Sequence, residues 1–265
     1  MKKLFDKGLN LLKGNKLLEF FKRSENFAEK FGLVCLYGIF PILGIAFCCK
    51  YATGLDAMFG SAAVVALGFV VVCLILGYIA DKMLEYVKPS IDQAKTHIVN
   101  GAFLDVLAFL SGIIALISGI VALVTICMGH VIFALSSLVV CGLTLYLAVM
   151  FLAPTKMLNV SVQDSATPAQ SLIAITALLI KASYRLVPFA FGVAMLLSVA
   201  NGIDLAFITH TIPKLTLLTF VYTLLYSALL PLIGYFVFLG YYFVLDLCMS
   251  LFRIADAVEG KNKAK

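Results

Sequence analysis

The sequence contains no tryptophan, few charged residues and only three histidines, and these shortages exclude several classes of protein. Charged residues make up 13% of the 265-residue chain and apolar residues 63%, whereas a soluble domain averages roughly a quarter charged and half apolar. The mean hydropathy of +1.07 indicates a membrane protein. The length leaves no room for a separate soluble catalytic domain. Because there is no tryptophan, we expect the 11 Tyr and 21 Phe to be the aromatic residues that fill the core and the interfaces.

Motifs for common catalytic chemistries are also missing. There is no HExxH, P-loop, GxSxG or Rossmann fingerprint, and the seven cysteines form no CxxC pair and no zinc-spaced Cys/His cluster. The histidines lie outside the predicted spans or at their edges, so they do not suit haem ligation. On the predicted outer loops, no metal-ligand spacing relates Asp56, His130, Asp204 and His210. We therefore expect no enzyme, no metal and no cofactor.

Long apolar segments predict an all-α integral membrane bundle of six transmembrane helices arranged as three hairpins. Five of the six predicted spans approach or exceed the ~20 residues that cross a bilayer, and the fifth, 187–200, is shorter. The spans cover about residues 32–49, 57–80, 106–128, 131–153, 187–200 and 215–245. They form a membrane domain over residues 32–253, which is preceded by residues 1–31 and followed by a polar tail, 254–265.

The segment 1–31 is basic and amphipathic. Leu4, Leu11 and Leu18 repeat every seven residues along an apolar stripe that also carries phenylalanines. Such a helix suits a membrane surface with anionic lipid. It equally suits docking on a partner helix, or packing on its own bundle as a cytoplasmic lead-in.

The distribution of Lys and Arg predicts the orientation in the membrane. Of the 20 such residues, all but Lys50 and Lys214 fall in segments that lie on one side if six spans are present. Because cytoplasmic segments are enriched in Lys and Arg, we expect both termini to be cytoplasmic. The expected location is a bacterial inner membrane or its equivalent.

Small residues repeat along the third predicted span at alternating spacings of four and three. The run comprises Gly101, Asp105, Ala108, Gly112, Ala115, Gly119 and Ala122. In lipid, helices associate by close backbone approach, so a face of small residues marks a packing surface. We expect this helix-packing seam to face a neighbouring helix or a second protomer.

Proline and capping residues predict where helices bend and begin. Ser90 with Gln93 forms a Ser-x-x-Gln capping box, which predicts a helix start at Ile91 that leads into the third span. Thr167 and Pro168 predict a second helix start. Prolines within spans remove a backbone hydrogen bond and kink the helix. The predicted kinks lie at Pro41, Pro188 and Pro231.

Four charged residues are predicted at one depth near the cytoplasmic ends of the spans. They are Asp105, Lys181, Arg185 and Asp246. Ionisable groups near hydrocarbon are costly unless paired or hydrated. One interpretation is a vestibule or gate in which Asp105 or Asp246 meets Arg185. The alternatives are a structural pair that pins helices, or snorkelling of Lys and Arg. If residues 167–200 form one tilted span, Lys181 and Arg185 lie near mid-membrane and favour a charged translocation path.

These patterns favour a non-catalytic membrane subunit with a structural or assembly role. It would pack through small-residue faces and present basic helices to lipid or to a partner. The alternative is a small transporter or channel with a polar gate on its cytoplasmic side, since kinked helices often expose backbone at binding sites. Expected partners are membrane lipids and either further copies of the chain or a larger membrane complex, and no nucleic acid.

Overall fold

The computed structural model describes residues 15–52, 59–94, 96–98, 101–129, 131–162, 168–203, 205 and 214–263. Residues 1–14 of the predicted amphipathic segment lie outside this range, as do Asp56, His130, Asp204 and His210. In chain order the elements are α2 (Asn15–Val34), η1 (Cys35–Ile39), α3 (Phe40–Ala52), α4 (Phe59–Gln93), β1 (Thr96–Ile98), α5 (Gly101–Cys127), α6 (Val131–Leu152), α7 (Pro154–Met157), β2 (Val160–Val162), α8 (Pro168–Ile203) and α9 (Lys214–Lys263).

The structure confirms an almost entirely helical protein with multiple candidate membrane spans. Six helices are long and apolar enough to cross a bilayer, with candidate spans of 20 to 33 residues. These spans are Leu17–Phe47, Ala63–Gln93, Gly101–Cys127, Phe133–Leu152, Ser171–Ile203 and Thr219–Leu251. Many large apolar side chains on these helices are exposed, as expected of surfaces that face lipid.

Within the described residues, no break separates the N-terminal helix from the first span. Helix α2 continues through η1 into α3. The short π-helical turn η1 lies immediately before Pro41, where the Phe40 N–H donates to the Cys35 carbonyl. A proline ring clashes with the carbonyl four residues earlier, and the wider π turn relieves that clash. The predicted irregularity at Pro41 therefore takes the form of a π turn.

Two predicted helix boundaries have different outcomes. The predicted start at Ile91 is wrong, because α4 runs through Pro89 to Gln93 and α5 begins only at Gly101. The start at Pro168 is confirmed. Neither Pro188 in α8 nor Pro231 in α9 ends its helix, since a proline removes only one backbone bond of the ladder. The candidate span in α8 therefore includes both Lys181 and Arg185.

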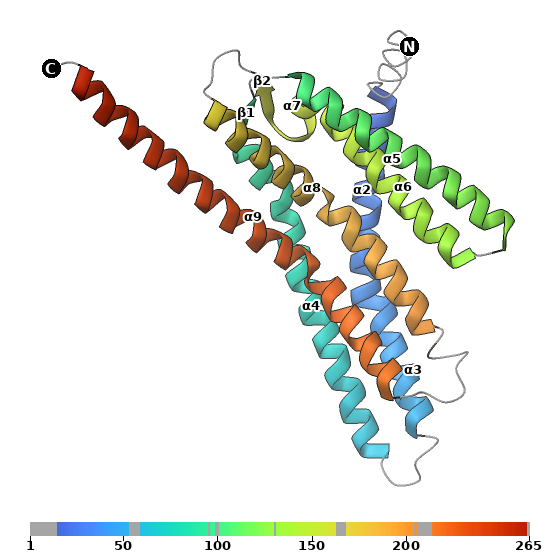
Figure 1. Cartoon of the computed structure of the whole chain (residues 1–265). Coiled ribbons are helices and arrows are strands. Elements are labelled where there is room, and N and C mark those ends of the chain that lie inside the picture. Colours follow the sequence, from blue (N-terminus) through green and yellow to red (C-terminus); the bar gives the residue numbers. More distant parts are fainter. Residues whose placement is uncertain are drawn as a thin grey trace.

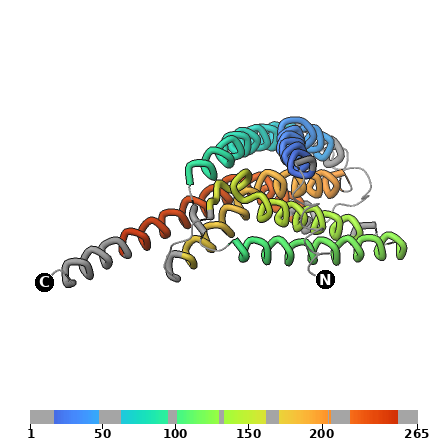
Figure 2. The backbone as a smooth tube through the Cα atoms, turned by 90° about the horizontal axis from the view of Figure 1, so that it is seen from above, coloured from blue at the N-terminus to red at the C-terminus, as the bar shows by residue number. Residues whose placement is uncertain are grey.

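The helices pack as a main group with a helix pair along one side (Figure 1). In the side pair, α5 packs chiefly against α6, and α6 in turn contacts α8 and α2. Three seam alanines of α5, Ala108, Ala115 and Ala122, are buried. Viewed from above, the C-terminal part of α9 extends away from the other helices (Figure 2).

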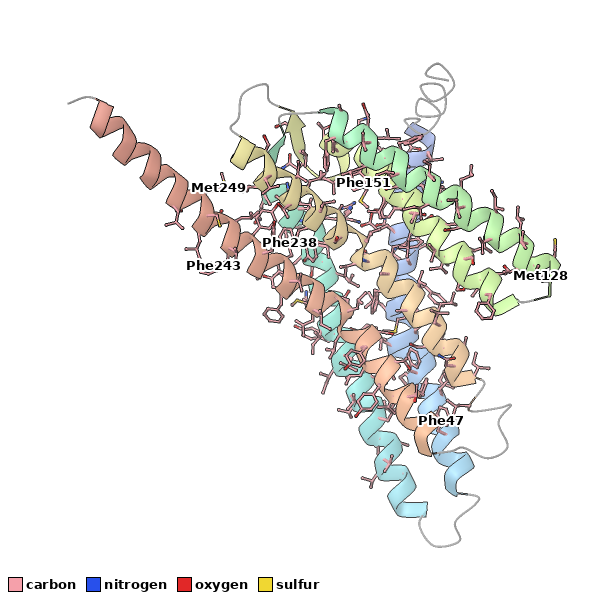
Figure 3. All side chains as sticks on the ribbon, in the orientation of Figure 1. Phe47, Met128, Phe151, Phe238, Phe243 and Met249 are labelled. Carbon is pink, nitrogen blue, oxygen red and sulfur yellow. The ribbon has the colours of Figure 1, made fainter. Side chains whose placement is uncertain are left out.

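Two apolar cores hold the bundle together. The first joins η1, α3, α4, α8 and α9 and includes Leu36, Phe40 and Phe191. The second joins α5, α6, α7, β2 and the N-terminal parts of α2 and α8, and includes Phe21 and Leu178. Figure 3 labels Phe238 of the first core and Phe151 of the second, each of which is 4% exposed. Phe243, on the projecting part of α9, is 67% exposed.

Helices α2 and α8 approach each other closely at Gly192. A Cβ atom placed there would lie 2.4 Å from the Ala28 carbonyl oxygen and 2.7 Å from the Ala28 Cβ. Because one of these atoms belongs to the backbone, a side chain at position 192 must push the two helices apart. Glycine is therefore needed at this crossing for steric reasons.

We expect Gly192→Ala to destabilise the protein by about 1–3 kcal/mol, the usual cost of overpacking. The matched control is Gly68→Ala, since nothing lies within 4 Å of a Cβ built at Gly68. Thermal unfolding in detergent, followed by circular dichroism, compares the two variants. Equal melting temperatures would show that the close crossing of α2 and α8 does not form.

Candidate functional site

A fully buried carboxylate lies where four helices meet. Glu25 of α2 accepts a hydrogen bond on Oε2 from the Tyr146 hydroxyl of α6 (2.9 Å) and another from Arg185 Nη2 of α8 (3.1 Å). Lys88 Nζ of α4 lies 3.7 Å from Glu25 Oε1. We call these four residues the Glu25 cluster. It places two cations around one carboxylate.

The cluster lies at the junction of the two apolar cores. Along α2, Glu25 stands between Phe21 of the second core and Cys35 of the first, and Arg185 has the corresponding position on α8. Tyr146 is held by a stacked contact with Phe21, with ring centroids 5.1 Å apart. Burying charges without partners costs several kcal/mol each. Neither Glu25 nor Arg185 can therefore be buried at this junction at low cost without the other.

The cluster is closed on one side and open on the other. The Arg185 side chain is almost wholly buried, whereas that of Lys88 is 43% exposed and also donates to Asn26 Oδ1 at 2.8 Å. Among the described residues, Glu25 Oε1 and Arg185 Nε have no hydrogen-bond partner. Incompletely satisfied buried polar groups of this kind mark either strain or function.

Lys181 forms a second buried polar site one helical turn before Arg185. Its ammonium donates to the carbonyl oxygens of Ala94, Leu158 (3.0 Å) and Asn159 (3.4 Å). These carbonyls lie just beyond α4 and α7, where a lysine can satisfy the free acceptors of a helix end. The Asn159 side chain donates to the Asp92 carbonyl at 2.6 Å. The backbone of Asn159 has a positive φ of 50°.

The same lysine contacts the segments that carry the only strand pairing found in the described part of the chain. Strands β1 and β2 pair in parallel, with Thr96 opposite Val160 and Ile98 opposite Val162. Together with α7 they form what we call the strand connector, which joins the segment after α4 to the segment after α6 (Figure 1). Lys181 therefore ties α8 to both segments.

The structure separates the four charged residues that the sequence places at one depth. Lys181 and Arg185 share the buried side of α8, but Asp105 and Asp246 are exposed. The carboxylate that meets Arg185 is Glu25. Sequence reasoning did not single out Glu25, Tyr146 or Lys88. A signal existed, because Leu18, Phe21, Glu25 and Ala28 share one face of α2 and all are buried.

Many serine and threonine hydroxyls within the described helices bond to their own backbone. Each hydroxyl donates to the carbonyl oxygen of the residue three or four positions earlier, as from Ser111 to Leu107, from Thr144 to Val140 and from Thr223 to Thr219. Ser198 and Ser227 instead meet each other across α8 and α9 at 3.2 Å. Such self-satisfied hydroxyls offer a passing solute few donors or acceptors.

Within the described residues no group of three His, Cys, Asp or Glu side chains is placed to hold a metal ion. No protein-family model, curated protein or solved structure matches the chain. The chemistry of the site is therefore defined by its own residues, which are a buried ion pair, a tyrosine hydroxyl and a half-exposed lysine.

Proposed function

We propose that this chain is a non-catalytic membrane subunit with a structural or assembly role. The observation that carries the proposal is that the buried charged side chains have partners inside the bundle: Glu25 is held by Arg185 and Tyr146, and Lys181 by three backbone carbonyls. The helical hydroxyls that bond to their own backbone support the same function, since they leave few polar groups to form a solute path.

In this proposal the six spans form three hairpins with both termini in the cytoplasm of a bacterium or an equivalent compartment. The support is the placement of all Lys and Arg residues except Lys50 and Lys214 on one side. A fluorescent protein fused to the C-terminus and a periplasmic phosphatase fused in its place form the matched pair that tests orientation. Fluorescence without phosphatase activity is expected, and the reverse result contradicts the orientation.

The assembly role predicts that the chain purifies in mild detergent as part of a larger particle. Multi-angle light scattering, corrected for bound detergent, should give a protein mass of at least twice the 28.7 kDa of one chain. The exposed apolar surface of α9, including Phe243 and Leu247, offers an area for such packing. A protein mass equal to one chain, in every mild detergent tried, would contradict the assembly role.

A second candidate function is a small transporter or channel with a gate at the cytoplasmic end. It is favoured by two observations. The half-exposed Lys88 lies 3.7 Å from Glu25 Oε1 and so links a buried carboxylate to the surface. The candidate span Ser171–Ile203 also includes both Lys181 and Arg185. Proteoliposomes loaded with a pH-sensitive dye test it under an imposed membrane potential. The subunit proposal predicts no flux above that of empty vesicles. A flux that Lys88→Gln abolishes, in protein that still assembles, would favour the gate.

A further inference from the structure

A groove runs between α2 and α8 on the outer side of the bundle. It has a volume of about 620 Å³ and is lined by Phe20, Arg23, Phe27, Phe31, Phe189 and Leu196, among others. Its volume falls in the range of about 300–1,000 Å³ that is typical of small-molecule sites. The lining is apolar apart from Arg23 and Ser24.

The groove exists because its floor is made of small residues and its walls of aromatic ones. Ala28 and Gly192 meet at the crossing of the two helices. The Phe27 and Phe31 rings stack beside this floor with centroids 6.2 Å apart. Phe27 is 71% exposed. The shape follows from the same lack of a side chain at Gly192 that permits the close crossing.

The charge at the groove is positive. Arg23 is exposed and makes no ion pair with a carboxylate among the described residues, including Glu19 one turn earlier on α2. A guanidinium presents a planar set of donors that fits phosphate oxygens. An apolar groove with a single guanidinium therefore complements an anion that carries a long apolar chain.

Both walls of the groove belong to candidate membrane spans, Leu17–Phe47 and Ser171–Ile203, so the groove opens where acyl chains lie. We propose that this groove binds an anionic phospholipid, with an acyl chain along the phenylalanine rings and the headgroup phosphate on Arg23. The proposal deepens the membrane-subunit function and rests on the embedding of α2 and α8 in the bilayer. It names anionic lipid as the partner of the basic N-terminal helix.

The absence of tryptophan from the chain allows a direct test. Phe27→Trp places a single fluorescent reporter in the groove wall, and Phe243→Trp places one at a comparably exposed position on α9. Each full-length variant is reconstituted into two preparations of vesicles, both made of equimolar phosphatidylglycerol and phosphatidylcholine. In one preparation only the phosphatidylglycerol carries brominated acyl chains, and in the other only the phosphatidylcholine does. The ratio of the two quenching efficiencies gives the relative binding constant of anionic over zwitterionic lipid at that reporter.

We expect this constant to be about five at Phe27→Trp, the preference that one basic residue near the surface supplies. It should be near one at Phe243→Trp. Adding Arg23→Gln to Phe27→Trp should bring the constant close to one, whereas adding Lys22→Gln, an equal loss of charge from an exposed neighbour that does not line the groove, should leave most of the preference.

Three results would overturn the lipid site: equal quenching by both lipids at Phe27→Trp, an equal preference at Phe243→Trp, or a preference that survives Arg23→Gln. A failure of the proposed membrane embedding has a different signature. In that case neither reporter is quenched by either brominated lipid. Because Arg23, Lys22, Phe27 and Phe243 are all exposed, these substitutions leave the packed core unchanged.

Discussion

Replacing Glu25 with glutamine is expected to reduce the free energy of unfolding by about 3–5 kcal/mol, the usual effect of removing one partner from a buried ion pair. Glutamine keeps the size of the side chain but removes its charge. The Arg185 guanidinium, almost wholly buried and 3.1 Å from Glu25 Oε2, then remains in the core without a counter-charge. Because the cluster lies between the two apolar cores, the loss should loosen contacts of α2 with α8 and α6.

A double-mutant cycle separates the cost of the lone charge from the value of the pair. Glu25→Leu combined with Arg185→Met should recover most of the stability lost in either single variant, because a buried ion pair can be replaced by apolar residues at little cost. The exposed pair Lys82–Glu85, 3.0 Å apart against 3.1 Å for Glu25 and Arg185, is the control. There, Glu85→Gln should change stability by less than about 1 kcal/mol. Additive single effects at Glu25 and Arg185 would contradict the pairing.

The second large effect is expected at Lys181, where methionine should cost about 2–3 kcal/mol. The substitution keeps the apolar stem but removes the ammonium that donates to the carbonyls of Ala94, Leu158 and Asn159. Hydrogen bonds from a charged donor are stronger than those between neutral groups, and buried acceptors left without a donor are costly. The destabilisation should be largest in the strand connector.

Hydrogen exchange of the backbone amides locates this effect. In Lys181→Met, amides of β1 and β2 should exchange at least tenfold faster, whereas those in the middle of α9 should change little. Lys82→Met is the matched control, because Lys82 is exposed and bonded only to Glu85 among the described residues. Unchanged protection of β1 and β2 in Lys181→Met would show that the lysine does not hold the strand connector.

The features that could be predicted from the sequence depend on composition and local chemistry. The long apolar segments predict the six candidate spans. Thr167 and Pro168 predict the start of α8, which the structure places at Pro168. The helix start predicted from the capping box at Ser90 is wrong, because α4 continues through Pro89 to Gln93. Just after this helix, the Ala94 carbonyl accepts a hydrogen bond from Lys181, a tertiary contact that the local signal does not include.

The features that the sequence did not reveal depend on which helices become neighbours. Glu25 is one of several charges in a basic amphipathic helix, and its role depends on Arg185, 160 residues later in the chain. Strands β1 and β2 have three residues each, too few for a recognisable alternation, and Lys181 bonds to carbonyls next to both strands from a helix far along the chain. The signal that the sequence does contain is the charge of Glu25 within an otherwise apolar stripe of α2.

The separation of Glu25 from Arg185 in the chain has a consequence for how the protein enters the membrane. At about 5–20 residues synthesised per second, the 160 residues between them take roughly ten to thirty seconds to emerge. Throughout this interval the carboxylate has no Arg185, and Lys88 of α4, which lies between them in the chain, is the first of its two cations to be made. The contact between Glu25 and Arg185 can form only after this part of α8 has been synthesised, so we expect α2 to reach its final packing late in membrane insertion.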